Sequence, residues 1–264
     1  MEDDLAVDII REPQVRLVGR QIIDEAELSR FLAEEGVETW KTDTAIAAEK
    51  IIEVAGRLCY KSYARPRPGG NAAYIGHLLE VGHGSVLEHA VFNFIITGVS
   101  RSFTHELIRH RAGWAYSQRS QRFVDESKCS FVEPDAIAED PELHRIWLDA
   151  ILTCQRAYRA LADGLAAKFS HIEDKTLRRK KAREAARSVL PNATETEIFV
   201  TANARALRHF IEMRGDAAAD VEIRKVALLI LKLLQAESPN LFGDYTLIDL
   251  PEGGQAVTTP HRKV

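Results

Sequence analysis

The residues best suited to chemistry lie close together in the stretch THELIRHRAGWAYSQRSQR, which runs from Thr104 to Arg122. Its basic side chains are those of Arg109, His110, Arg111, Arg119 and Arg122, and among them stand Ser117, Gln118, Ser120 and Gln121. A guanidinium is a rigid fork of donors that matches paired oxygens, and hydroxyls and amides add directed hydrogen bonds to that charge. Although an arbitrary run of arginines is usually a solvated face, the aromatic residues threaded through this one favour a site for an anionic, planar ligand.

Three further segments bring cations next to hydrogen-bonding groups. Residues 82–90, GHGSVLEHA, hold Ser85 and Glu88 between histidines, and Arg187 ends a basic run. Residues 203–214 add Asn203, Arg205, His209 and Arg214. Together the four segments favour an enzyme that acts on a nucleotide or a phosphorylated small molecule. No Gly-rich Rossmann fingerprint follows a strand, and no cysteine stands beside a histidine as an activated nucleophile would.

A zinc hydrolase is the first alternative function. His105-Glu106-Leu107-Ile108 begins an HExxH motif, but the second histidine is His110, one residue late. On a helix, a spacing of five residues turns the two rings about 140° apart, so they could not share one metal ion as an i, i+4 pair does. Arg109 and Arg111 would also repel a dication. We therefore expect no metal site.

A nucleic-acid binder is the second alternative. It could use the basic helix expected at 174–187 together with the arginines of 109–122. The formal net charge of −4 argues against general nucleic-acid binding. The basic helix also lacks the aromatic residues on which bases stack. We expect no nucleic-acid partner.

The hydrophobic spacing predicts the elements that must position these residues. We expect an edge strand at 15–23, a buried strand at 91–99, a strand at 193–203 and a C-terminal hairpin turning at Gly253-Gly254. Helices are expected at 44–59 with Thr44 as N-cap, at 71–81, after a cap at Ser100 or Ser102, and at 141–169, 174–187, 203–214 and 217–237. The break ARPRPGGN at 64–71 interrupts them. Strands and long helices without a βαβ rhythm indicate an α+β fold class, and no boundary divides residues 1–264.

Composition and cysteine usage limit the protein class and its compartment. A chain of 264 residues with 45% hydrophobic and 28% charged residues is an ordinary globular protein with a sizeable core. Residues 2–4 are acidic, which is not a signal-peptide pattern, and the longest apolar run, 226–231, is too short to cross a bilayer. Cys59, Cys129 and Cys154 form no framework. We expect a cytoplasmic protein with no membrane partner.

RHR followed by YSQRSQRF resembles the RHR-x7-S signature of the flavin-dependent thymidylate synthases (ThyX). Further blocks resemble the family in family order: GRLCYKS (56–62), VGHGSVLEHA (81–90), SRSFTHELIRHR (100–111), ARSVLPNATET (186–196), NARALRHFIEMR (203–214) and DVEIR (220–224). They span residues 56–224. The resemblance implies one catalytic domain with a mixed or antiparallel sheet packed by long helices, and residues 245–264 as a C-terminal hairpin and tail. It also implies a homotetramer with shared active sites, in which residues 83–89 come from a neighbouring chain.

The resemblance further implies the reductive methylation of dUMP to dTMP without an enzymic cysteine adduct. 5,10-Methylenetetrahydrofolate would give the carbon and NADPH the electrons, and bound FAD would relay the hydride. By position, FAD would be held by Ser85, Glu88, Arg109, His110, Arg111, Gln118, Asn203, Arg205 and His209. dUMP would be lined by Glu106, Arg109, Gln118, Arg119, Ser120, Gln121, Arg122, Arg187 and Arg214. Arg214 would be the catalytic residue, because a cation facing the uracil favours its N3-ionised form.

Two departures from the family pattern stand out. Eight residues, not seven, separate Arg111 from Ser120, so we expect a one-residue bulge at 112–114. Family members often have a histidine near 218, where this chain reads Ala217-Ala218-Ala219.

Several site residues also have a structural alternative. Ser120 could be a turn hydroxyl, His209 a core residue, and Glu88 a group that orients a neighbour; His83 and His89 could be structural.

Overall fold

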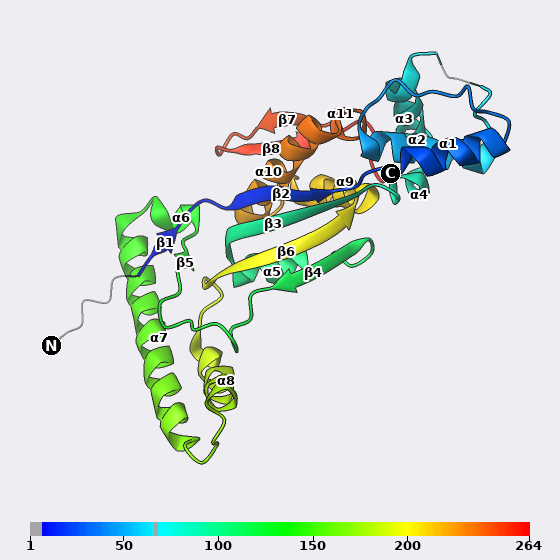
Figure 1. Cartoon of the computed structure of the whole chain (residues 1–264). Helices are drawn as coiled ribbons and strands as arrows, with labels where there is room; N and C mark the ends of the chain where they lie inside the picture. The colour runs from blue at the N-terminus through cyan, green and yellow to red at the C-terminus, as the bar shows by residue number, and fades with distance from the viewer. Residues whose placement is uncertain (1–6, 66–67) are drawn as a thin grey trace. The chain divides into compact units, whose positions relative to one another are not determined.

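The computed structural model describes residues 7–65 and 68–264 (Figure 1). The chain groups into two compact units, each assembled from three separate stretches. Of the described residues, unit 1 contains 7–14, 96–108 and 117–198, and unit 2 contains 15–65, 68–95, 109–116 and 199–264. Since the stretches alternate along the chain, no single cut in the sequence separates the units.

The main sheet has four strands in the order β2 (Gln14–Arg20), β3 (Val91–Ser100), β6 (Glu195–Asn203) and β4 (Trp114–Gln118). The predicted edge position of β2 is confirmed, as is the predicted strand β3. Phe92, Phe94 and Ile96 are at most 1% exposed, and the residues between them are only partly buried. This alternation follows from the two-residue period of a strand, which turns one set of side chains towards the core.

Two short strand pairs complete the β structure. In unit 1, β1 (Ile9–Ile10) pairs in parallel with β5 (Phe131–Val132). In unit 2, β7 (Thr246–Asp249) pairs antiparallel with β8 (Gln255–Thr258). Gly253 and Gly254 have φ angles of 96° and 76° in the connecting turn, a conformation that other residues rarely adopt. The predicted C-terminal hairpin and the α+β fold class are therefore confirmed.

Unit 1 contains α5 (Arg101–Leu107), α6 (Asp135–Ala138), α7 (Pro141–Lys168), α8 (Lys175–Ala186) and the 3-10 turn η1 (Arg187–Val189). Helices α7 and α8 lie side by side (Figure 1). Asp140 and Asp174 cap them. Each carboxylate accepts hydrogen bonds from backbone N–H groups of the first turn, which have no partner within the helix. On α7, Tyr158 is fully buried, and Trp147 packs on the cluster of Cys129, Phe131 and Ile151.

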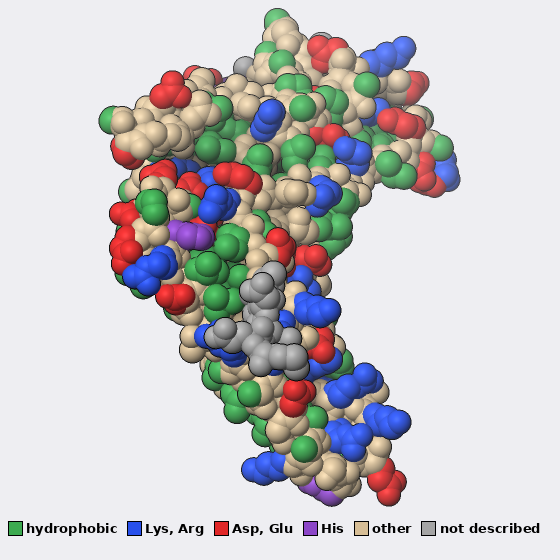
Figure 2. Space-filling model, turned by 90° about the vertical axis from the view of Figure 1, so that its left-hand side faces the viewer, with side chains coloured by type: hydrophobic (Ala, Val, Ile, Leu, Met, Phe, Trp, Pro, Cys, Tyr) green, Lys and Arg blue, Asp and Glu red, His purple; other side chains and the backbone are tan. Residues whose placement is uncertain are grey.

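Helix α8 confirms the predicted basic helix. Its sequence KTLRRKKAREAA has a lysine or arginine at six of its 12 positions. Only Ala182 and Ala186 are buried on this helix. Figure 2 shows Lys and Arg side chains gathered on the outer end of the α7–α8 pair. The charge of α8 is therefore mostly on the solvated side.

Unit 2 contains α1 (Glu25–Glu34), α2 (Ala47–Tyr60), α3 (Gly70–Glu80), α4 (Gly84–Leu87), α9 (Ala204–Arg214), α10 (Val221–Glu237) and α11 (Pro239–Phe242). The predicted helix is confirmed in α10, and its inward face is formed by Ile223, Val226, Ile230 and Leu234, which are all 0% exposed. Apolar residues three or four positions apart lie on one side of a helix, and that side packs into the core. Within the described residues, no helix is both long and apolar enough to span a membrane.

Two predicted helix starts are wrong. Helix α2 begins at Ala47 with Ile46 as its N-cap, and no side chain caps it. The Thr44 hydroxyl instead donates to Glu49 at 2.7 Å and accepts from the Ile46 N–H. Helix α10 begins at Val221, not at 217, because Asp220 caps it and Asp216 holds a turn by accepting from the Ala218 N–H at 2.9 Å.

The predicted break at 64–71 falls partly outside the described residues, at 66 and 67. Helix α3 begins at Gly70, one residue before the predicted start. The Ser100 alternative for the cap of α5 is confirmed, since its hydroxyl accepts from the Phe103 N–H at 3.0 Å.

Candidate active site

The residues expected to form the site divide between the two units. Unit 1 contains Glu106, Gln118, Arg119, Ser120, Gln121, Arg122 and Arg187. Unit 2 contains Ser85, Glu88, Arg109, His110, Arg111, Asn203, Arg205, His209 and Arg214. With the exception of Gln118, the residues expected to hold FAD thus belong to one unit.

In unit 1, the segment Gln118–Arg122 continues from the end of β4. The Gln118 amide donates to the hydroxyls of Thr104 at 3.0 Å and Thr196 at 3.4 Å. The Ser120 hydroxyl oxygen accepts from the Arg122 N–H at 3.4 Å, which is the turn role considered above. Because this bond uses only an oxygen lone pair, the Ser120 hydrogen can still be donated to a ligand.

Among the cations expected to line dUMP in unit 1, Arg122 and Arg187 are more accessible than Arg119. Arg122 forms an ion pair with Glu184 at 3.0 Å, and the two side chains are 40% and 50% exposed. Arg187 is exposed at the start of η1, and its side chain has no ion pair among the described residues. An exposed ion pair is worth about 0–1 kcal/mol, so a phosphate can displace one at little cost.

Arg101 is a site residue that the sequence reasoning missed. Its Nη2 donates to the backbone oxygen of Arg119 at 2.9 Å, and its buried Nε has no hydrogen-bond partner among the described residues. Burial lowers the pKa of Arg101, and the neighbouring charges of Arg119 and Arg187 lower it as well. The carboxylates of Glu126 and Glu195 raise the pKa of Arg101 and so offset part of the repulsion among the three guanidiniums. The sequence signal that could have identified Arg101 is its position directly after the predicted strand and the cap Ser100.

In unit 2, His110 lies in an aromatic cluster. The centroid of its ring is 5.2 Å from that of Phe210, 6.0 Å from His209 and 6.2 Å from Trp114. Arg214 Nε donates to His110 Nε2 at 3.0 Å. Burial lowers the pKa of His110 to about 4, and the charge of Arg214 lowers it further in the same direction. His110 is therefore neutral at physiological pH, with its proton on Nδ1 so that Nε2 can accept.

A tight turn carries the extra residue between Arg111 and Ser120. The Trp114 N–H donates to the Arg111 oxygen at 3.3 Å, and Gly113 has a φ angle of 75°. A Cβ at Gly113 would lie 2.7 Å from the Asn203 amide nitrogen, so only glycine fits. Tyr116 donates its hydroxyl to the His110 oxygen and closes the turn. The irregularity expected at 112–114 is thus a glycine turn packed on the start of α9.

Helices α4 and α9 bring three of the predicted FAD residues together. Arg205 Nη1 lies 2.6 Å from Glu88 Oε1, so Glu88 does orient a neighbour. A Cβ at Gly84 would lie 2.8 Å from Arg205 Nε, and the glycine therefore makes room for the guanidinium. Asn203 caps α9 by accepting from the Ala206 N–H at 2.8 Å. His209 is exposed, so the core alternative for it is wrong.

The donors of unit 2 fit a dinucleotide cofactor. The side chains of Arg109 and Arg111 are exposed and form no ion pair among the described residues. These two guanidiniums lie in the same unit as the exposed Arg205 and His209, and their charge suits a diphosphate. Within residues 7–65 and 68–264, no group of three His, Cys, Asp or Glu side chains could hold a metal ion. Helix α5 ends at Leu107, so His110 does not share a helix with His105.

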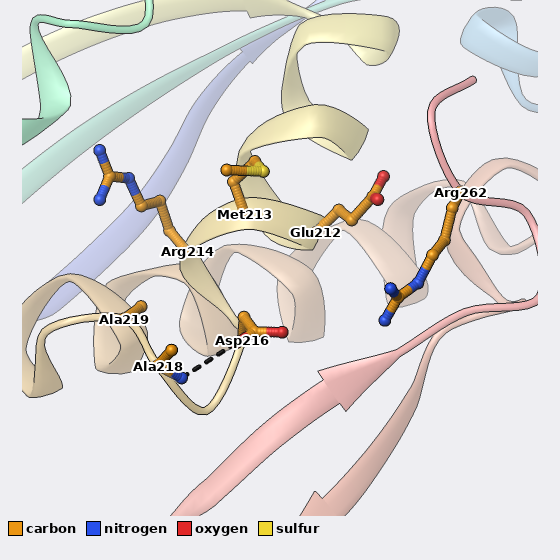
Figure 3. Close-up of a pocket in the computed structure, with 7 residues that line it drawn as sticks. All are labelled: Glu212, Met213, Arg214, Asp216, Ala218, Ala219 and Arg262. Atoms are coloured by element: carbon orange, nitrogen blue, oxygen red, sulfur yellow. Dashed lines mark hydrogen bonds between the residues drawn. The ribbon is translucent and has the colours of Figure 1, made fainter.

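A cavity of about 350 Å³ opens beside Arg214 (Figure 3). Its lining comes from the end of α9, from the turn that follows, and from Arg262 near the C-terminus. Glu212 and Arg262 lie on the same side of it, whereas Arg214 points to the opposite side (Figure 3). Ala218 and Ala219 form part of its wall. Their small side chains leave that space open.

The three cysteines are free. Cys129 is buried, Cys154 is half-buried and Cys59 is exposed. Burial raises the pKa of the Cys129 thiol to about 12. Since the thiolate is the nucleophilic form, Cys129 is inert at neutral pH.

Comparison with known proteins identifies the family. The family model described as thymidylate synthase complementing protein matches residues 42–240. The flavin-dependent thymidylate synthase of Mycolicibacterium gilvum is 48% identical over 242 residues, which cover 91% of this chain and 94% of the relative. That of Mycobacterium avium is 49% identical over 232 residues, covering 87% and 92%.

A solved structure shares the fold. The UMP/dUMP methylase PolB from Streptomyces cacaoi aligns with a TM-score of 0.65 at 22% sequence identity, covering 90% of this chain and 96% of that protein. The family model spans most of the chain, and the relatives align along nearly their whole length. This chain belongs to the family of the flavin-dependent thymidylate synthases.

Proposed function

We propose that the chain catalyses the reductive methylation of dUMP to dTMP with FAD as its flavin. 5,10-Methylenetetrahydrofolate supplies the carbon and NADPH the electrons. The observation that carries the proposal is the 3.0 Å contact between Arg214 Nε and His110 Nε2. It brings the guanidinium expected to act on the uracil next to the RHR segment expected to hold the flavin, and both lie in unit 2.

Arg214 activates the uracil by charge. A guanidinium stays protonated at any working pH, so it stabilises the N3-ionised ring without titrating itself. Ionisation at N3 raises the electron density at C5, where the new carbon bond forms. His110 fixes the guanidinium by accepting from Nε, and because its own pKa is about 4 it does so as a neutral ring. A charged imidazole would place N–H against N–H and lose this contact.

The remaining side chains bind the nucleotide and the cofactor. Arg122 and Arg187 carry the charge for the phosphate of dUMP, while Gln118, Ser120 and Gln121 supply directed hydrogen bonds. Glu106 and Arg109 complete the lining, and Arg119 belongs to the same segment as Gln118 and Ser120. Ser85, Glu88, Arg109, His110, Arg111, Gln118, Asn203, Arg205 and His209 hold FAD. When bound, FAD supplies hydride transfer, and the folate supplies the one-carbon unit.

Several features of the assembled enzyme belong to the same proposal. The chain forms one ThyX-like catalytic domain over residues 1–264 and assembles as a homotetramer with shared sites. It works in the cytoplasm, where its three free cysteines stay reduced.

The test is direct. Purified protein should show the absorbance of an oxidised flavin, which hot-acid extraction and chromatography identify as FAD. Flavin-loaded protein given dUMP, methylenetetrahydrofolate and NADPH should form dTMP, and omission of any one should abolish it. A colourless protein that forms no dTMP after addition of FAD refutes the proposal.

A further inference from the structure

We infer that Arg119 serves dUMP binding through its ion pair with Glu195, as a positioning residue for the segment 118–122, and that its guanidinium does not touch the nucleotide. The inference rests on the proposed function, because it assigns roles within the nucleotide-binding segment. It separates Arg119 from Arg122, which has the same charge and lies three residues away. The contacts of Arg119, Glu195 and Arg122 all lie within unit 1.

The guanidinium of Arg119 is already engaged by acceptors of the protein. Its Nη2 lies 2.7 Å from Glu195 Oε2 and 2.7 Å from the Glu195 backbone oxygen. Glu197 Oε1 lies 3.7 Å from Nη1, and Glu126 Oε2 lies 3.9 Å from Nη2. The Nε atom is buried and has no hydrogen-bond partner among the described residues. A phosphate bound to this cation would therefore compete with the Glu195 carboxylate for Nη2, in the field of two further carboxylates.

Glu195 is fixed to the fold on its other side. It begins β6 and is only 6% exposed. Its Oε1 accepts from the Gly98 N–H at 3.2 Å, and its own N–H donates to the Ser130 oxygen at 3.0 Å. Both carboxylate oxygens thus accept hydrogen bonds, one from β3 and one from Arg119. Breaking a buried pair of this kind leaves an uncompensated charge.

The main chain of Arg119 is held as well. Its N–H donates to the Glu197 oxygen at 2.9 Å, and its oxygen accepts from Arg101 at 2.9 Å. Because both its side chain and its main chain are hydrogen-bonded to the protein, residue 119 fixes the position of the segment. Its neighbours Gln118 and Ser120 are thereby held in place for a ligand. Side chains held within a few tenths of an ångström are what tight binding needs.

Arg122 differs in each of these respects. Its one ion pair, with Glu184, is 3.0 Å long and exposed, with side-chain exposures of 40% and 50%. The corresponding values for Arg119 and Glu195 are 20% and 8%. The exposed pair can open for an anion, whereas the buried one cannot do so cheaply.

Glu195→Gln tests the inference. An amide offers one acceptor where the carboxylate offers two, so its NH₂ must face either Gly98 N–H or Arg119. Loss of a charge-assisted hydrogen bond of this kind corresponds to about a tenfold effect or more. We expect dUMP to bind flavin-loaded protein about tenfold more weakly by calorimetry, with flavin occupancy kept. Hydrogen exchange at the Arg119 amide should be faster. Arg119→Leu and the double variant should bind dUMP as weakly as Glu195→Gln, because all three break the same interaction.

Glu53→Gln is the matched control. Glu53 pairs with Arg57 at 2.7 Å, the same length as the Arg119–Glu195 pair, with side-chain exposures of 3% and 4%. It should lower the melting temperature without changing dUMP affinity or exchange at residue 119. If Glu195→Gln leaves dUMP affinity unchanged or tightens it while Arg119→Leu weakens it, Arg119 is a direct ligand and the inference is wrong.

A second result would also overturn the inference. A lower melting temperature for Glu195→Gln with unchanged exchange at 119 would mean that the pair only stabilises the fold. Failure of the proposed function looks different. In that case the parent protein forms no dTMP and binds no dUMP, and the exchange measurement alone decides whether Glu195 positions the segment.

Discussion

Among single residues, Arg214 has the most specific expected effect. If it stabilises the uracil anion, Arg214→Ala should stay folded and keep FAD, yet lose dTMP formation by about a hundredfold or more, the cost of a lost charge-assisted contact. Arg214→Lys should rescue only part of the rate, because a point charge does not reproduce the fork. Single-turnover formation of dTMP measures both. A rate for Arg214→Ala close to that of the parent would exclude the activating role.

Arg187→Ala should behave differently. As a contact to the phosphate, Arg187 should matter for dUMP affinity and much less for the rate at saturating dUMP. A KM for dUMP raised about tenfold with a nearly unchanged kcat is the expected result. Equal losses in kcat for the Arg187 and Arg214 variants would mean that the two roles are not separate.

The pKa of His110 predicts a pH dependence. In the folded chain it is lowered from 6.5 to about 4, mainly by burial. Above pH 6.5 the ring is neutral whether the chain is folded or not, so it does not affect stability. As the pH falls from 6.5 towards 4, the unfolded chain takes up a proton that the folded chain refuses, and stability falls. His110→Asn keeps an acceptor for Arg214 but cannot titrate, so its melting temperature should vary less over this range. Parallel pH profiles for parent and variant would contradict the assignment.

The cysteines supply a further prediction. Replacing all three by serine should leave dTMP formation intact in protein that folds and holds flavin. The stability cost should come from Cys129, the buried one, and not from the exposed Cys59. A hydroxyl in the place of the buried thiol would be more polar than its apolar surroundings favour. Single variants separate the two effects. A cysteine whose loss abolishes turnover in folded, flavin-loaded protein would imply a covalent nucleophile.

On the scale of elements, α9 contributes both to the stability of the fold and to the candidate site. Asn203 caps the helix, and its amide also packs against Gly113 of the turn that carries Arg111. Asn203→Ala should lower the free energy of unfolding by about 1 kcal/mol through loss of the cap. Asn203→Ser keeps a capping oxygen and should restore stability. If Asn203 also binds FAD, Asn203→Ser should regain stability but not flavin affinity. If the serine variant regains both, Asn203 serves only as the helix cap.

Elements set by local patterns could be predicted from the sequence. The apolar stripe of α10 and the alternation of β3 were read correctly, because each depends on residues only a few positions apart. The helix starts at α2 and α10 were not, since several polar residues competed as caps. Thr44 donates its hydroxyl to Glu49 and does not cap α2, and Asp220 caps α10 in place of the residues before it. Such competition is decided by tertiary packing.

The candidate site shows the same limit. The residue types near 109–122 could be recognised, but their partners could not. Glu195 lies 76 positions from Arg119, and Arg214 lies 104 positions from His110. Nothing in the spacing tells which arginine is tied to a buried carboxylate and which is left for a ligand. That distinction needs the fold.

At the scale of the whole molecule, the exposure of the site predicts assembly. The side chains of Ser85, Glu88, Arg109, Arg111, Arg205 and His209 are all exposed in the single chain. A cofactor site usually buries about 70–90% of its ligand, which these open segments cannot do alone. Large apolar side chains are exposed on the same unit, with Ile22 at 90%, Tyr60 at 68% and Met213 at 53%. Exposed side chains of this kind mark association sites where they form a contiguous patch.

We therefore expect FAD to bind without covalent attachment and only to the assembled protein. Sedimentation velocity followed at the flavin absorbance should show the yellow species at the mass of a homotetramer. Because a shared site links cofactor binding to assembly, dilution should release FAD and dissociate the protein together, and added FAD should shift the assembly to lower protein concentrations. Salt-dissociated chains serve as the control and should sediment without colour. A monomer carrying a full complement of flavin would show that one chain buries the cofactor by itself, and the shared site would have to be abandoned.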